Sequence, residues 1–111
     1  MVTPYTQNLA RVTAVSAGEA PLFTVPSGFV YVVRSITAAL YGSGPPYLGL
    51  GGFAIMVPLN NPIFSALSPI AKRNVTYTWE GRIALSVSQQ LLYQAYDSGW
   101  SFNVTGYQFA T

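Results

Sequence analysis

Short runs of β-branched and aromatic residues, separated by Gly, Pro and Ser, are the feature that most constrains how this chain folds. Residues 100–105 (WSFNVT) show the pattern best, because large apolar side chains alternate there with small polar ones. A period of two is typical of a strand that is buried on one face. No segment combines a helical period with good helix formers. The sequence therefore predicts an all-β protein with almost no helix.

The apolar runs recur about every ten residues, which is the spacing of short strands in a sandwich. The predicted strands cover residues 10–16, 21–25, 29–40, 53–57, 63–67, 74–79, 82–87, 90–96 and 100–109. About eight antiparallel strands at this spacing predict a single β-sandwich, and a jelly roll or a related Greek key fits best. The length suits one domain. We expect the sandwich to span residues 10–111, after a polar N-terminal arm at residues 1–9.

The longest predicted strand, residues 29–40, contains one conflict. Arg34 falls on its more apolar face, with Val32 and Ile36. Either a β-bulge turns this side chain outward, or the guanidinium is buried beside a partner. A buried guanidinium is costly unless it is paired, and Glu80 is the natural partner in a chain with so few charges. Arg34 and Glu80 are therefore a candidate structural ion pair, and loss of Glu80 would then destabilise the fold or the assembly.

Glycine and proline mark the predicted connections. Residues 41–52 are so rich in both that they are expected to form a flexible loop, neither helix nor central strand. Glu80-Gly81 is expected to form a tight connection between two strands, and residues 97–99 a hairpin turn. Gly106 interrupts the last strand where its apolar face switches, which indicates a bulge or a bend.

Ionised side chains are scarce. Lys, Arg, Asp and Glu make up 7% of the chain, where ordinary soluble domains carry about 25%. A small monomer usually keeps itself soluble with a charged surface, and wide apolar patches usually mark contact sites. We therefore expect self-association, against the alternative of a monomer coated in uncharged polar side chains. The candidate subunit contacts are aromatic and leucine residues of the arm and the glycine-rich segment, Tyr5, Tyr41, Tyr47, Leu48 and Leu50.

The composition argues against most enzyme chemistry. The chain has no His and no Cys, and its acids are Glu19, Glu80 and Asp97. General acid–base catalysis, nucleophilic triads and protein metal sites all draw on those residue types. Residues 49–52 lack the Lys-Ser/Thr of a phosphate-binding loop. We therefore expect no catalytic residues, no metal, no cofactor and no enzymatic activity.

Charge and hydropathy also bound the partners. The net charge of +2 comes from scattered groups, with Lys72 and Arg73 the one adjacent basic pair. Nucleic-acid binding needs clustered Lys or Arg, so it is not expected. No signal peptide is visible, and the longest apolar stretch, residues 48–59, is too short to span a bilayer. We expect a protein made in the cytoplasm and not inserted in a membrane.

Residues 79–82 (WEGR) form the most distinctive local cluster. Trp79 is either a sugar-binding aromatic with polar neighbours or a core residue near the end of a strand. The core interpretation is favoured, because aromatic side chains dominate the cores of small domains.

Two blocks of the chain resemble small virion proteins of tailed bacteriophages, notably phages of actinobacteria. The first is residues 22–36 (LFTVPSGFVYVVRSI), with a Val-Pro-x-Gly turn leading into a long strand. The second combines residues 79–85 (WEGRIAL) with 99–107 (GWSFNVTGY). The chain departs from these proteins at residues 86–90 (SVSQQ), where they often have a glycine-containing turn.

The resemblance implies a β-sandwich that decorates the capsid or belongs to the tail, and it transfers no catalytic residues. The leading hypothesis is a virion structural protein that stabilises the particle by binding copies of itself, as a trimer or larger ring, and a major capsid or tail protein. The alternative is a carbohydrate- or receptor-binding module of a phage tail, with exposed Tyr and Trp as stacking platforms.

Overall fold

The computed structural model is an all-β molecule built from eight strands. It describes residues 7–40, 48–57, 61–70, 75–96 and 99–111. The strands are β1 (Gln7–Val15), β2 (Gly18–Thr24), β3 (Phe29–Leu40), β4 (Leu48–Val57), β5 (Asn61–Ile70), β6 (Val75–Leu85), β7 (Gln90–Ala95) and β8 (Trp100–Ala110).

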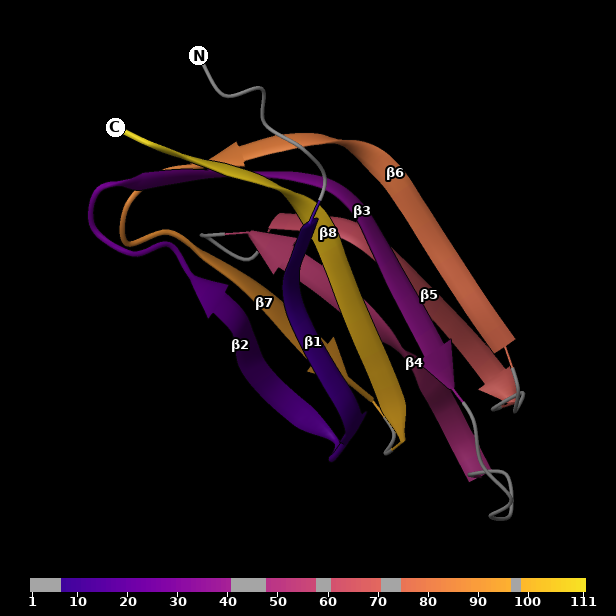
Figure 1. The fold of residues 1–111 in the computed structure, drawn as a ribbon. Helices are drawn as coiled ribbons and strands as arrows, with labels where there is room; N and C mark the ends of the chain where they lie inside the picture. The colour runs from indigo at the N-terminus through magenta and orange to yellow at the C-terminus, as the bar shows by residue number, and fades with distance from the viewer. Residues whose placement is uncertain (1–6, 41–47, 58–60, 71–74, 97–98) are drawn as a thin grey trace.

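The strands form two four-stranded antiparallel sheets that pack as two layers (Figure 1). The first sheet has the order β1-β8-β3-β6, and the second has the order β2-β7-β4-β5. Apart from β4 and β5, strands that follow each other in the chain lie in different sheets. This order is that of a jelly roll, in which two Greek keys interlock. The predicted fold class is confirmed.

Aromatic side chains fill the space between the sheets. Phe53 of β4 is 0% exposed. Its ring centroid lies 4.8 Å from that of Trp100 and 5.7 Å from that of Phe102, both on β8. It also lies 5.0 Å from Phe64 and 5.8 Å from Tyr77. Phe53 therefore contacts four rings from the three strands β5, β6 and β8, and it lies at the centre of the core.

A bulge in β3 resolves the conflict at Arg34. Val33 pairs with Gly106 of β8 and Ser35 pairs with Thr105, so Arg34 is an extra residue between them. The register against β6 also shifts at this point, but there the extra residue is on β6, because Gly81 and Arg82 both lie opposite Arg34. The extra residue on β3 reverses the inward face, so Val33 before it and Ile36 after it both belong to the core. Arg34 is exposed, as the bulge alternative predicted.

Gly106 permits this bulge. A Cβ at position 106 would overlap the backbone carbonyl of Val32, so the two strands approach too closely there for any side chain. The predicted irregularity at Gly106 is confirmed, although the extra residue itself lies on β3.

The predicted connection at Glu80-Gly81 is wrong, because β6 runs without interruption from Val75 to Leu85. The glycine serves a different purpose. A Cβ on Gly81 would lie 2.5 Å from the indole of Trp79, so the glycine makes room for that ring. Trp79 is half-buried and packs against the core, which confirms the core interpretation.

The predicted loop at residues 41–52 is wrong in its second half, because β4 begins at Leu48 and lies inside the second sheet. The glycines are tolerated because this end of β4 is irregular. Its register against β5 shifts between Leu48 and Gly51, and its register with β7 begins at Phe53. Residues 41–47 lie outside the described part of the chain.

The start of β1 and the turn after Leu85 also differ from what the sequence suggests. β1 begins at Gln7, within the segment expected to be an arm, because Gln7 and Asn8 pair with β8. The turn after Leu85 contains no glycine, and Ser88 takes a positive φ of 71° there. The Gln89 side chain accepts a hydrogen bond from the Ser86 amide at 2.7 Å, which stabilises this turn.

Candidate functional site

The outer face of the first sheet is covered by short polar side chains. These side chains alternate with core residues along each strand, so they point away from the second sheet. One row across the sheet is Thr78, Thr37, Asn103 and Arg11, and the next is Glu80, Ser35, Thr105 and Asn8. The Ser35 and Thr105 hydroxyls are hydrogen-bonded to each other. The Asn8 amide donates to the Asn103 side-chain oxygen at 2.6 Å.

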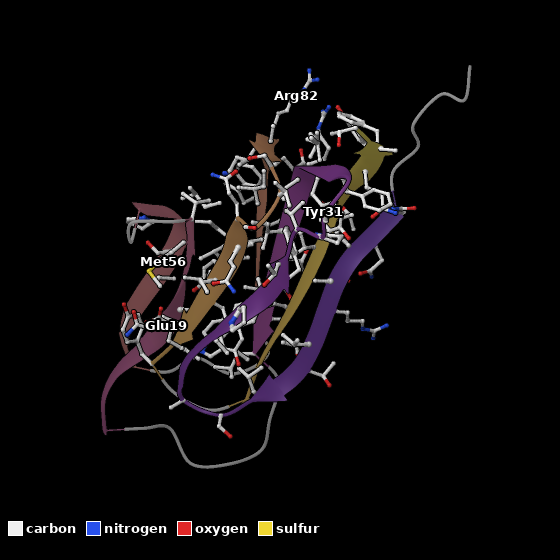
Figure 2. All side chains as sticks on the ribbon, turned by 90° about the vertical axis from the view of Figure 1, so that its left-hand side faces the viewer. Glu19, Tyr31, Met56 and Arg82 are labelled. Atoms are coloured by element: carbon white, nitrogen blue, oxygen red, sulfur yellow. The ribbon has the colours of Figure 1, made fainter. Side chains whose placement is uncertain are left out.

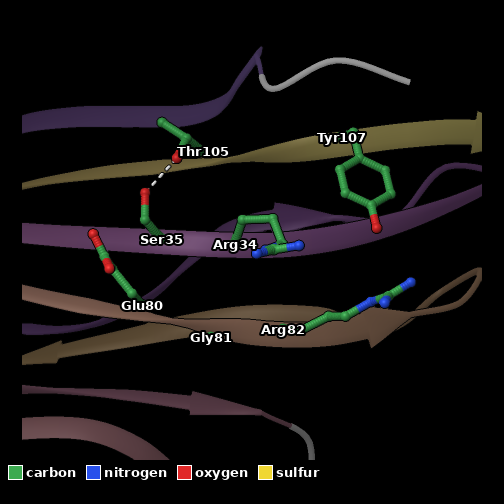
Figure 3. Close-up of a pocket in the computed structure, with 7 residues that line it drawn as sticks. All are labelled: Arg34, Ser35, Glu80, Gly81, Arg82, Thr105 and Tyr107. Atoms are coloured by element: carbon green, nitrogen blue, oxygen red, sulfur yellow. Dashed lines mark hydrogen bonds between the residues drawn. The ribbon is translucent and has the colours of Figure 1, made fainter. Parts of the chain in front are cut away.

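A groove of about 990 Å³ opens on this face where β6, β3 and β8 meet around the bulge. Its volume is in the range of small-molecule sites. It is lined by Arg34, Ser35, Glu80, Gly81, Arg82, Thr105 and Tyr107 (Figure 3).

Charge is unevenly distributed in the groove. Figure 3 shows the Arg34 and Arg82 guanidinium groups directed toward the end that holds Tyr107, whose hydroxyl points into the same region. The Glu80 carboxylate lies toward the other end, near Ser35. The Arg82 side chain also reaches outward in Figure 2. The groove therefore has a basic end with a phenol and an acidic end with hydroxyls.

The structure brings Arg34 and Glu80 to this one groove, but both side chains are exposed. The guanidinium is not buried, so the physical reason for expecting a charge partner no longer applies. The bulge exposes Arg34, and Arg82 follows Gly81 on the neighbouring strand. The sequence alone does not bring Arg34 and Arg82 to one site, because their proximity depends on how β3 and β6 align.

A second, smaller hollow lies on the same face over β1, β8 and β3. It has a volume of about 460 Å³ and is lined by Asn8, Arg11, Val12, Thr13, Thr37, Ala39, Ser101, Phe102 and Asn103. Among the described residues, three arginines and one glutamate thus lie on this face.

The outer face of the second sheet has a different character. An apolar row crosses its four strands in register and consists of Pro21, Leu92, Met56 and Pro62. Met56 is 7% exposed yet does not belong to the core cluster, because it points away from the first sheet. Figure 2 shows Met56 and Glu19 on the side formed by this sheet. Glu19 is the charged residue that the structure describes there.

The predicted subunit contacts fall mostly outside the described residues. Tyr5, Tyr41 and Tyr47 lie there, whereas Leu48 and Leu50 belong to the backbone of β4. The large apolar side chains that the structure shows to be exposed are Val87, Tyr96 and Phe109. The sequence does not predict this apolar row, because residues 53–57 are apolar at every position. They show no alternation that would distinguish inward-facing from outward-facing side chains.

Other site types have no geometric basis in the described residues. No group of three or more carboxylate side chains is placed there to hold a metal ion. No helix of that part is long and apolar enough to cross a membrane.

A comparison with models of known protein families found no match, and neither did a comparison with curated protein sequences.

Proposed function

We propose that this chain is a structural subunit of a bacteriophage particle, which binds copies of itself through the outer face of its second sheet and decorates or stabilises a capsid or tail. The observation that carries the self-association is the apolar row Pro21, Leu92, Met56 and Pro62. Pro21 and Pro62 are exposed and Leu92 is half-buried in the single chain, so the apolar surface of these three side chains gains free energy when another protein covers it.

The occupant that best fits this face is a second copy of the chain. The face is almost uncharged in its described part, so two copies meet without burying unpaired ions. The Cα atoms span 51 × 26 × 19 Å, and a broad side of this size can supply the roughly 800 Å² per partner that a stable interface buries. The assignment to a phage particle is supported by the resemblance of residues 22–36, 79–85 and 99–107 and by the jelly-roll fold, which is common in viral capsids.

The self-association is tested with Leu92→Glu, which places a charge at the centre of the row. Light scattering should show oligomers for the unmodified chain and monomers for this variant, because burial of an unpaired carboxylate is costly. Pro21→Glu, at an exposed position of the same row, should act in the same direction. Thr78→Glu is the matched control, because it adds the same charge on the first sheet and should leave the oligomer intact. Equal effects of Leu92→Glu and Thr78→Glu, with circular dichroism unchanged, would contradict the proposal.

The particle assignment is tested with an antibody raised against the chain. We expect it to label the surface of purified phage particles made from the genome that encodes the protein. Particles that contain no detectable copy of the chain by mass spectrometry would overturn the assignment.

A further inference from the structure

The groove around Arg34 and Arg82 has no role in the proposed self-association, because it lies on the other sheet. Its basic end contains two guanidinium groups from neighbouring strands. Both guanidinium groups are exposed, and the nearby carboxylate, on Glu80, is directed to the opposite end (Figure 3). An anion bound at the basic end would pair with both arginines, and arginine forks match the geometry of a carboxylate.

The backbone conformation places both arginine side chains on the outer face of the first sheet. Arg34 faces outward because it occupies the bulge in β3, and that bulge requires the close approach of Val32 to Gly106. Gly81, which precedes Arg82, also lines the groove, and a Cβ at this position would meet the Trp79 indole. Both arginine side chains are exposed, so their guanidinium groups are accessible to a ligand in the groove.

The surroundings of the arginines indicate a hydroxyl-rich ligand. Ser35, Thr105 and Tyr107 line the groove with hydroxyl groups, and Glu80 can accept hydrogen bonds from ligand hydroxyls at the other end. The Tyr107 ring is half-buried and offers a partly apolar surface of the kind on which a sugar ring stacks.

The same face continues beyond the groove. The polar rows lead across the sheet to the second hollow, where Arg11 lies beside Asn103. Basic groups are thus repeated along the face and are separated by hydroxyls and amides. The hydroxyl and amide side chains between the arginines suit an extended anionic polymer that itself carries many hydroxyl groups. A nucleic acid calls for clustered Lys or Arg along its phosphates, which this face does not show among the described residues.

We propose that this groove binds a chain of carboxylated sugars of the uronic-acid type, with one carboxylate held between Arg34 and Arg82 and a sugar ring against Tyr107. A particle subunit with this site would attach to acidic polysaccharide at a surface. The site and the apolar row are on opposite sheets, so Leu92→Glu can abolish self-association while the groove remains intact, and each proposal can fail alone.

The test is calorimetric titration of the full chain with oligogalacturonate. Arg34→Ala and Arg82→Ala should each weaken binding about tenfold or more, because each removes a charge-assisted pair. Arg34→Lys should weaken it less, since the charge is kept and the fork is lost. Ala17→Glu, in the turn between β1 and β2, lowers the net charge as much as either Arg→Ala change, and should alter affinity less than about twofold.

Four results would overturn the proposal. The first is no binding of oligogalacturonate by the unmodified chain. The second is equal binding of its uncharged methyl ester. The third is an Ala17→Glu loss as large as that of Arg34→Ala, which would show a general charge effect. The fourth is tighter binding of polyglutamate or single-stranded DNA than of the sugar, which would assign the groove to an acidic peptide or a nucleic acid.

Discussion

Replacing Phe53 by Ala removes the side chain on which the core is centred. Phe53 is fully buried, and its ring lies 4.8–5.8 Å from four other rings. A buried Phe→Ala change costs about 3–5 kcal/mol. Favourable ring pairs are worth about 0.5–1.5 kcal/mol each beyond the area that they bury, so the loss should lie at the upper end of the range for such changes, near 5 kcal/mol. A domain of this kind has about 5–15 kcal/mol of total stability, and the variant should therefore be close to unfolding.

The assay is urea denaturation followed by tryptophan fluorescence, because Trp100 is in ring contact with Phe53. With a slope of about 1.5 kcal/mol per molar urea, the expected loss corresponds to a midpoint lower by roughly 3 M. Phe109→Ala is the matched control. That ring is 40% exposed and contacts Tyr107 on the outside of the sheet, so its removal should cost less than about 1 kcal/mol. Equal losses for the two variants would refute the assignment of Phe53 as the centre of the core.

Three smaller changes test the backbone and the surface of the groove. Gly106→Ala should lower the unfolding free energy by about 2–3 kcal/mol, because a Cβ there overlaps the Val32 carbonyl; an unchanged melting temperature would rule out this close approach. Ser88→Gly should raise the unfolding free energy by about 0.5–1 kcal/mol, since the relief of a positive φ exceeds the entropy that glycine adds to the unfolded chain; a loss of stability in denaturant titration would argue against that backbone conformation. Glu80→Ala should change stability by no more than about 0.5 kcal/mol, because the side chain is exposed; a loss of several kcal/mol in the same titration would restore Glu80 as a structural partner of Arg34.

The sequence predicted the fold where the strand pattern is strongest. Residues 29–40 match β3 at both ends, and the alternation of residues 100–105 reproduces the inward face of β8. The same reasoning failed at residues 48–52 and at Glu80-Gly81, where glycine was taken to end a strand. In both places the glycine lies inside a strand, where it allows close packing or irregular pairing. Whether a glycine takes this role depends on contacts with residues far away in the chain.

The candidate site was harder to predict. The conflict at Arg34 was visible in the sequence, and it correctly indicated a bulge as one of two solutions. The meeting of Arg34, Arg82 and Tyr107 was not visible, because it depends on the register of three strands. The apolar row likewise exists only when β2, β7, β4 and β5 lie side by side.

The most direct test of the proposed function is sedimentation velocity of the unmodified, full-length chain from low micromolar to near-millimolar concentration. A self-associating subunit should shift from a monomer to a defined oligomer as the concentration rises, because a surface with few charges and an apolar row favours burial against another copy. A single monomeric species over the whole range would contradict self-association as the function of this protein.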